Sequence, residues 1–156
     1  MGFHLFIFLA LLTIPKSEAT ANRTDLHVAM AEMRSKSYYS FVMLLELLHS
    51  NGSQPQLSGE VTFLMPEDRK LSEFSVSVSS LRNFILSHTI PTPLNYNDFL
   101  HFPTGTLIPS GIQTRMITIQ NHGRSNFLVN NAQIVAPNVC QSSSIRCHGI
   151  DKVIEY

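Results

Sequence analysis

The chain has 156 residues, 44% of them hydrophobic, and a formal net charge of zero at pH 7. This length and this apolar fraction are typical of one globular domain with an ordinary core. Zero net charge argues against nucleic acid or an anionic bilayer as the main partner, because both attract proteins through a basic surface.

The N-terminus has the pattern of a secretory signal peptide. Residues 3–14 form an apolar run, which is too short to cross a bilayer comfortably. Polar and small residues follow, and we therefore expect a signal peptide over residues 1–21, cleaved after Ala19 or Ala21, and a single domain over residues 22–156. A retained signal anchor is the alternative, since no Lys or Arg precedes the apolar run.

Secretion gives meaning to two N-glycosylation sequons, which begin at Asn22 and Asn51. Such sites are modified only in the secretory pathway. Asn51 is the better candidate, because Asn51-Gly52 is also typical of an exposed turn. The last residues carry no hydrophobic lipid-anchor signal, so we expect a secreted, extracellular protein with no stable membrane anchor after signal cleavage.

The first half of the chain is predicted to be mainly helical. Apolar residues recur at three-to-four spacing from Leu26 to about His49, with polar residues at 35–37, which indicates two amphipathic helices separated by a break. The segments that follow are a strand over residues 60–65, a short helix and loop over residues 67–80, and a helix from Leu81 that ends at Pro91.

The second half changes to the pattern of short strands. Three of them are predicted over residues 115–120, 126–129 and 133–135, and one or two more over residues 145–154. Turn residues separate these partly β-branched segments. Helices first and strands later, without regular alternation, indicate an α+β domain.

The two cysteines, Cys140 and Cys147, are predicted to form a disulfide, as is typical of a close pair in an oxidising compartment. If Ser143 and Ser144 are the tip of a hairpin, the cysteines lie directly opposite each other. Their Cα atoms would then be about 4.5 Å apart, within the bridging range of ~4.4–6.8 Å. Ser-Ser is an unusual tight turn, which leaves the register open.

Several segments resemble, in order and spacing, the motifs of the fasciclin domain family. They are the apolar strand and acidic turn of Thr62–Asp68, the helix and His-x-x-Pro exit of Leu81–Leu94, the stretch Tyr96–Pro109, and the closing segments Val129–Asn138 and Ile145–Ile154. The resemblance runs from about Leu26 to Ile154 and is closest to plant-type, single-domain members.

The resemblance implies a helical layer packed on a twisted β-wedge and a role in cell adhesion or in matrix and cell-wall association. Pro66 and Asp68 would be structural, ending the strand and capping the next helix. His88 corresponds to the histidine of the family's Tyr-His element, which is linked with adhesion. Here Ser87 replaces the aromatic residue, which puts an adhesive role of this element in doubt.

The closing motif contains His148, Gly149 and Asp151. We expect Gly149 to allow a close backbone approach or a bulge. His88 shares a helix face with Leu81, since the two are seven residues apart. We expect both His88 and His148 to be packed, hydrogen-bonded core residues.

The sequence lacks the spacings that assemble a catalytic or metal site. Carboxylates and histidines that could act in catalysis are Glu67, Asp68, Asp98, Asp151, His88 and His148. None occurs in a known catalytic motif, and no Cys-x-x-Cys or paired-His spacing for zinc is present. We therefore expect a non-enzymatic domain without cofactor or metal.

The predicted partner is a matrix or cell-wall polysaccharide or glycoprotein, bound through exposed loops and strand edges. The alternative is a carrier of a small apolar ligand. The many Met, Leu and Phe residues permit such a pocket, although a core requires the same residues.

Overall fold

Five helices precede or flank the strands in the part of the chain that the structure describes. The computed structural model describes residues 18–52, 57 and 59–156, so most of the predicted signal peptide lies outside the described residues. The helices are α1 (Glu18–Ser35), α2 (Tyr39–Ser50), α3 (Asp68–Ser72), α4 (Leu81–Ser87) and α5 (Tyr96–Leu100). The predicted break between the first two helices is confirmed, and Ser37 adopts a positive φ of 68° there.

The strands form one seven-stranded sheet in the order β2-β1-β7-β6-β5-β4-β3. They are β1 (Thr62–Pro66), β2 (Thr89–Ile90), β3 (Leu107–Pro109), β4 (Met116–Asn121), β5 (Phe127–Val129), β6 (Ala132–Cys140) and β7 (Arg146–Ile150). The β1–β7 pair is parallel, and the other pairs are antiparallel. The expected α+β class is confirmed.

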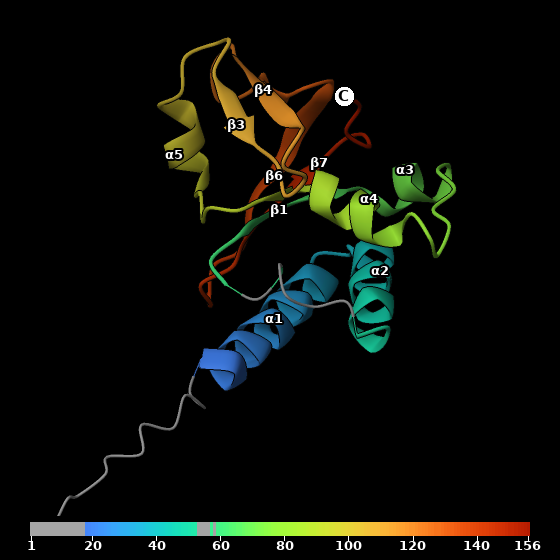
Figure 1. The fold of residues 1–156 in the computed structure, drawn as a ribbon. Coiled ribbons are helices and arrows are strands. Elements are labelled where there is room, and N and C mark those ends of the chain that lie inside the picture. The colour runs from blue at the N-terminus through green and yellow to red at the C-terminus, as the bar shows by residue number, and fades with distance from the viewer. Residues whose placement is uncertain (1–17, 53–56, 58) are drawn as a thin grey trace, which may run out of the picture.

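Two hydrophobic clusters lie on either side of strand β1. Phe63 and Met65 belong to the cluster that α1, α2, α3 and α4 cover. Leu64 points the other way, into the cluster formed by α5 and strands β3 to β6. Every residue of β1 is buried for this reason, and this is why the strand reads as a continuous apolar run. In Figure 1, α1 and α2 lie at one end of the molecule and the β3–β4 hairpin with α5 at the other.

Three boundaries differ from those that the sequence predicts. Helix α4 ends at Ser87 rather than at Pro91, because Thr89 and Ile90 pair with β1. Strand β6 is longer than predicted, since a β-bulge accommodates Pro137 and Asn138, with Asn138 at a φ of 54°. The closing segment forms one strand only, and from Asp151 onward the chain leaves the sheet.

Candidate functional site

His88 lies at the C-terminal end of α4, where its side chain is fully buried. Its Nε2 accepts a hydrogen bond from the Ile154 N–H at 3.0 Å, and its Nδ1 donates to the Phe84 carbonyl oxygen at 2.9 Å. The ring also packs against Phe84, with centroids 4.5 Å apart. His88 is thus a bridge between α4 and the last residues of the chain.

His148 plays the same part in the middle of β7. It is fully buried, its Nδ1 accepts from the Asn138 N–H at 3.0 Å, and its Nε2 donates to the Leu94 carbonyl oxygen at 2.8 Å. The ring meets Phe99 edge to face at 5.3 Å. It therefore ties β7 to the bulge of β6 and to the segment before α5.

Both histidines are neutral in this arrangement, because each has one nitrogen that accepts from a backbone N–H. Burial lowers the pKa of each ring from 6.5 to about 4. The hydrogen bonds to the Phe84 and Leu94 carbonyls oppose this effect on the pKa without reversing it. A neutral imidazole whose two nitrogens are both occupied is placed to hold structure rather than to exchange protons with a substrate.

Gly149, in β7, leaves room for the side chain of Tyr38, the residue directly before α2. A β-carbon at this position would lie 1.7 Å from the Tyr38 hydroxyl oxygen and 2.9 Å from the Ala136 β-carbon. Gly149 also pairs with Ala136 at the bulge between β6 and β7. The sequence predicts a close backbone approach or a bulge at Gly149. A bulge is present, and the atoms nearest to Gly149 belong to side chains rather than to the backbone. The hydroxyl of Tyr38 occupies the space that a side chain at position 149 would need, and nothing in the sequence around Tyr38 predicts this contact.

Asp68 caps a helix, but not the one that it opens. Its Oδ1 accepts from the Ser40 N–H at 3.0 Å, in the first turn of α2. The residue before α3 is Glu67, whose side chain makes no capping hydrogen bond. The expectation for Asp68 is therefore corrected, because its side chain turns from α3 toward the open N–H groups of α2. Pro66 is buried at the last position of β1.

Asp151 fixes the start of β6 against the end of β7. Its Oδ1 accepts from the Gln133 N–H at 2.7 Å, and its own N–H donates to the Gln133 carbonyl oxygen at 3.0 Å. Like His88, His148 and Asp68, it satisfies backbone groups. Each of these four side chains thus holds a different part of the fold together.

The predicted disulfide is present between Cys140 and Cys147, which are directly paired with Cα atoms 4.8 Å apart. The hairpin tip beyond it is tied to α1. The Glu32 carboxylate accepts from Ser142, and the Asp25 carboxylate accepts from Ser144. More than a hundred residues separate these partners in the sequence, so no local pattern reveals the contact.

Of the asparagines that begin the two sequons, only Asn51 has a side chain that the structure describes. Asn51 is exposed directly after α2, as an acceptor for a glycan must be. The side chain of Asn22 lies outside the described residues, and the proposed cleavage points at Ala19 and Ala21 fall within α1. Glycan attachment and signal cleavage both stay predictions.

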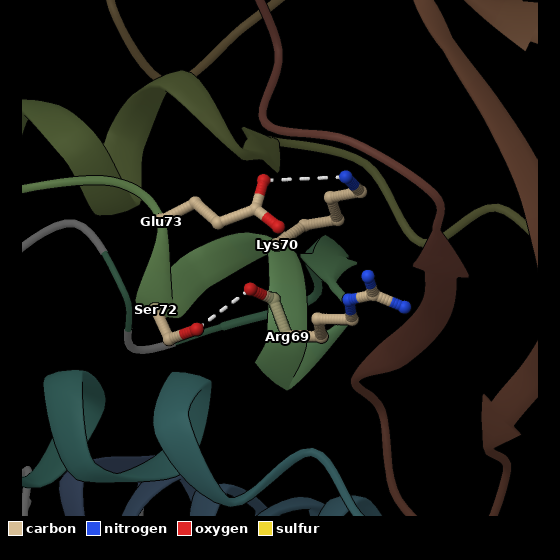
Figure 2. A network of polar contacts seen from close by, with 4 residues as sticks. All are labelled: Arg69, Lys70, Ser72 and Glu73. Atoms are coloured by element: carbon tan, nitrogen blue, oxygen red, sulfur yellow. Dashed lines mark hydrogen bonds and ion pairs between the residues drawn. The ribbon is translucent and has the colours of Figure 1, made fainter.

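The polar surface of α3 forms a local network rather than a site. Figure 2 shows the Lys70 Nζ beside Glu73 and the Ser72 hydroxyl on the Arg69 carbonyl, at 3.2 Å and 2.7 Å, with the Arg69 guanidinium directed away from Glu73. An exposed pair such as Lys70–Glu73 contributes at most about 1 kcal/mol to stability. These contacts support the end of a short helix.

One open hollow of about 320 Å³ lies beside the last residues of the chain. Its lining residues are Thr114, Arg115, Met116, Thr118, Asn130, Glu155 and Tyr156. None of these residues is predicted from the sequence to belong to a binding site. They come from three separate segments that only the sheet brings together, although an arginine and a terminal aromatic residue are chemically suited to binding.

The part of the chain that the structure describes contains neither a metal-ligand cluster nor a helix that could cross a membrane. Over residues 18–52, 57 and 59–156, no three His, Cys, Asp or Glu side chains are grouped closely enough to hold a metal ion. Within the same ranges, every helix is too short or too polar to cross a membrane.

Comparison with known proteins identifies the family. The fasciclin domain model matches residues 39–156. A FAS1 domain-containing protein of Selaginella moellendorffii is 30% identical over 98 residues, which are 61% of this chain and 38% of that protein. The solved FAS1 domain pair from the insect cell adhesion molecule fasciclin I aligns with a TM-score of 0.51 at 17% identity, over 88% of this chain and 46% of that one.

These relatives bear on the fold more than on the activity. The chain spans less than half the length of either protein, and structural likeness at 17% identity shows the fold alone. The family match covers most of the chain and includes α2, the whole sheet and every residue of the closing motif. The chain therefore belongs to the fasciclin domain family, a family of cell-adhesion-type domains.

Proposed function

We propose that this chain is a secreted, non-enzymatic fasciclin domain that binds a matrix or cell-wall polysaccharide or glycoprotein. The supporting observation is that the residues best suited to chemistry are used in the fold. His88 and His148 are fully buried with both ring nitrogens bonded, and the cysteines are joined. Contacts with a partner must then come from the exposed surface.

An extracellular location is consistent with the disulfide, which persists in oxidising compartments. The predicted signal peptide and the exposed Asn51 support the same location, the apoplast or cell wall if the source is a plant. The carrier alternative has less support. The described hollow is open, and an arginine, a glutamate, an asparagine and two threonines are among its lining residues, whereas a small apolar ligand requires an apolar cavity that buries most of its surface.

An array of cell-wall polysaccharides and matrix glycoproteins tests the proposal. The domain, secreted from a eukaryotic host and carrying its glycan, is applied at two salt concentrations. We expect saturable binding to one class that persists at the higher salt, because the chain has no net charge to drive binding. Absence of binding to every component would contradict the proposal, and native mass spectrometry of the same sample would then show whether an apolar ligand is carried.

A further inference from the structure

We propose that the hollow beside the C-terminal residues binds a hexuronate unit, the acidic sugar of an anionic polysaccharide. This inference rests on the proposed function and names the class of polysaccharide. The hollow measures about 320 Å³, which lies within the range of roughly 300–1,000 Å³ typical of small-ligand sites. A single sugar ring with its neighbours in a chain suits an open hollow of this size.

The walls of the hollow are held in place by hydrogen bonds from two asparagine side chains to the backbone. Asn130 adopts a φ of 54°, its Oδ1 accepts from the Thr118 N–H, and its Nδ2 donates to the Glu155 carbonyl oxygen. Asn131 accepts from the Glu155 N–H at 2.9 Å. The turn between β5 and β6 thus fixes the path of the last residues, and a fixed site loses less entropy when it binds.

Arg115 supplies a positive charge that is not held in an ion pair with any of the described residues. Its guanidinium lies 5.0 Å from the centre of the Tyr156 ring. Among the residues that the structure describes, no ion pair involves Arg115, and its side chain is exposed. A planar guanidinium stacked on an aromatic ring keeps its outer N–H groups free for a carboxylate, which it can bind with two parallel hydrogen bonds.

Tyr156 presents a ring that is anchored at one end and open at the other. Its hydroxyl donates to the Ser87 carbonyl oxygen, yet 47% of the residue stays exposed. Aromatic rings that are apolar in the body and polar at the tip are favoured at binding surfaces. The C–H face of a pyranose ring has the matching apolar character, so the ring and Arg115 together suit a sugar that carries a carboxylate.

Glu155, Thr114 and Thr118 offer hydrogen-bonding groups for the sugar hydroxyls and favour a sugar with a single negative charge. The exposed carboxylate of Glu155 can accept from sugar hydroxyls, and Thr114 and Thr118 can donate or accept. Glu155 also adds a negative charge to the lining of the hollow without forming an ion pair with Arg115, which disfavours densely charged anions such as sulfated or phosphorylated chains. A ring with one carboxylate and several hydroxyls fits both charges.

Calorimetric titration with a short oligogalacturonate tests this site. Its fully methyl-esterified form is the matched ligand, since esterification removes the charge and keeps the sugar. We expect Arg115→Gln to weaken binding of the acid about tenfold or more and to leave binding of the ester unchanged. Lys36→Gln is the matched control, because it removes the same charge from the exposed turn between α1 and α2. It should bind like the wild type.

The aromatic part is tested separately. Tyr156→Phe keeps the ring and should retain most of the affinity, whereas Tyr156→Ala should lose about tenfold or more. Equal affinity of Arg115→Gln and wild type for the acid, or equal affinity of wild type for acid and ester, would overturn the inference. If the array still shows a bound polysaccharide or glycoprotein in that case, the proposed function stands without this site.

Discussion

At the scale of single residues, the contact between Gly149 and Tyr38 leaves the least room for change. The hydroxyl of Tyr38 occupies the place of the missing side chain, because a β-carbon on Gly149 would lie 1.7 Å from it. Tyr38 stands directly before α2, and Gly149 lies in β7. This contact therefore sets how closely the N-terminal end of α2 can approach the sheet.

We predict that Gly149→Ala lowers the free energy of unfolding by about 3 kcal/mol, since the new β-carbon would overlap the Tyr38 side chain, which is buried and must shift to make room. Chemical denaturation measures the loss. Gly123→Ala is the control, because its β-carbon would meet nothing within 4 Å although φ is +97°. Only the left-handed backbone should then cost energy, about 1 kcal/mol. Equal losses in the two variants would show that the contact with Tyr38 is not restrictive.

His88 shows which features of a single residue the sequence can predict and which it cannot. The burial of His88 follows from its spacing to Leu81 on one helix face, and this part was predictable. Its hydrogen bond to Ile154 joins residues that are 66 positions apart, so no local pattern in the sequence predicts it. Arg115 and Tyr156 were missed for the same reason, since 41 positions separate them and neither belongs to a motif.

At the scale of elements, the start of α2 depends on a side chain from another helix. The first N–H groups of any helix lack partners within it. In α2 the Ser40 N–H donates to Asp68, at the first position of α3. One carboxylate therefore joins two helices that are separated along the chain by β1.

Asp68→Ala should lower the free energy of unfolding by about 1 kcal/mol, the usual cost of a lost cap. Glu67→Ala is the matched control, because it removes a neighbouring exposed carboxylate that makes no capping hydrogen bond. It should change stability by less than about 0.5 kcal/mol. The same loss in both variants would mean that overall charge, and not the hydrogen bond to Ser40, accounts for the effect.

The disulfide between β6 and β7 offers a second test at this scale. We predict that the double variant Cys140→Ala/Cys147→Ala is less stable by about 2.5 kcal/mol, because the closed loop is short. Adding a reductant to the wild type should cause a similar loss and should leave the variant unaffected. A wild type that keeps its stability under full reduction would contradict this account.

Element boundaries show where local patterns stop being informative. The pairing of Cys140 with Cys147 follows from a hairpin of short span, and the structure confirms it. Pro137 looks like a strand breaker, yet the bulge lets β6 continue through it. The sequence predicts that α4 extends to Pro91, whereas the helix ends at Ser87. The strand that follows it is only two residues long and depends on pairing with β1, so no local pattern reveals it.

At the scale of the whole molecule, the fold is closed by contacts between distant segments. Strand β1 pairs in parallel with β7, so Thr62 lies beside Arg146. The order of helices and strands made an α+β domain predictable, whereas the parallel pairing of β1 with β7 leaves no periodic signal in the sequence. The resemblance to the fasciclin family implied a helical layer on a twisted β-wedge but did not specify this pairing, which the structure alone shows.

The two buried histidines, His88 and His148, make the stability of the folded protein depend on pH. In the unfolded chain they titrate near 6.5, whereas in the folded protein burial lowers the pKa of each to about 4. Between these values the unfolded state binds more protons, so the free energy of unfolding falls as pH decreases from 6.5 toward 4. The loss is complete below the folded pKa and amounts to about 3 kcal/mol for each histidine.

Denaturation midpoints measured from pH 7 to pH 5 test this prediction, since most carboxylates stay ionised over that interval. His148→Gln should be less stable than the wild type at pH 7 and should lose less stability on acidification. His122→Gln is the control, because His122 is exposed and its removal should leave the profile parallel to that of the wild type. A flat wild-type profile, or an unchanged slope in His148→Gln, would mean that the ring takes up a proton within the fold. The hydrogen bonds to Asn138 and Leu94 would then not restrain it.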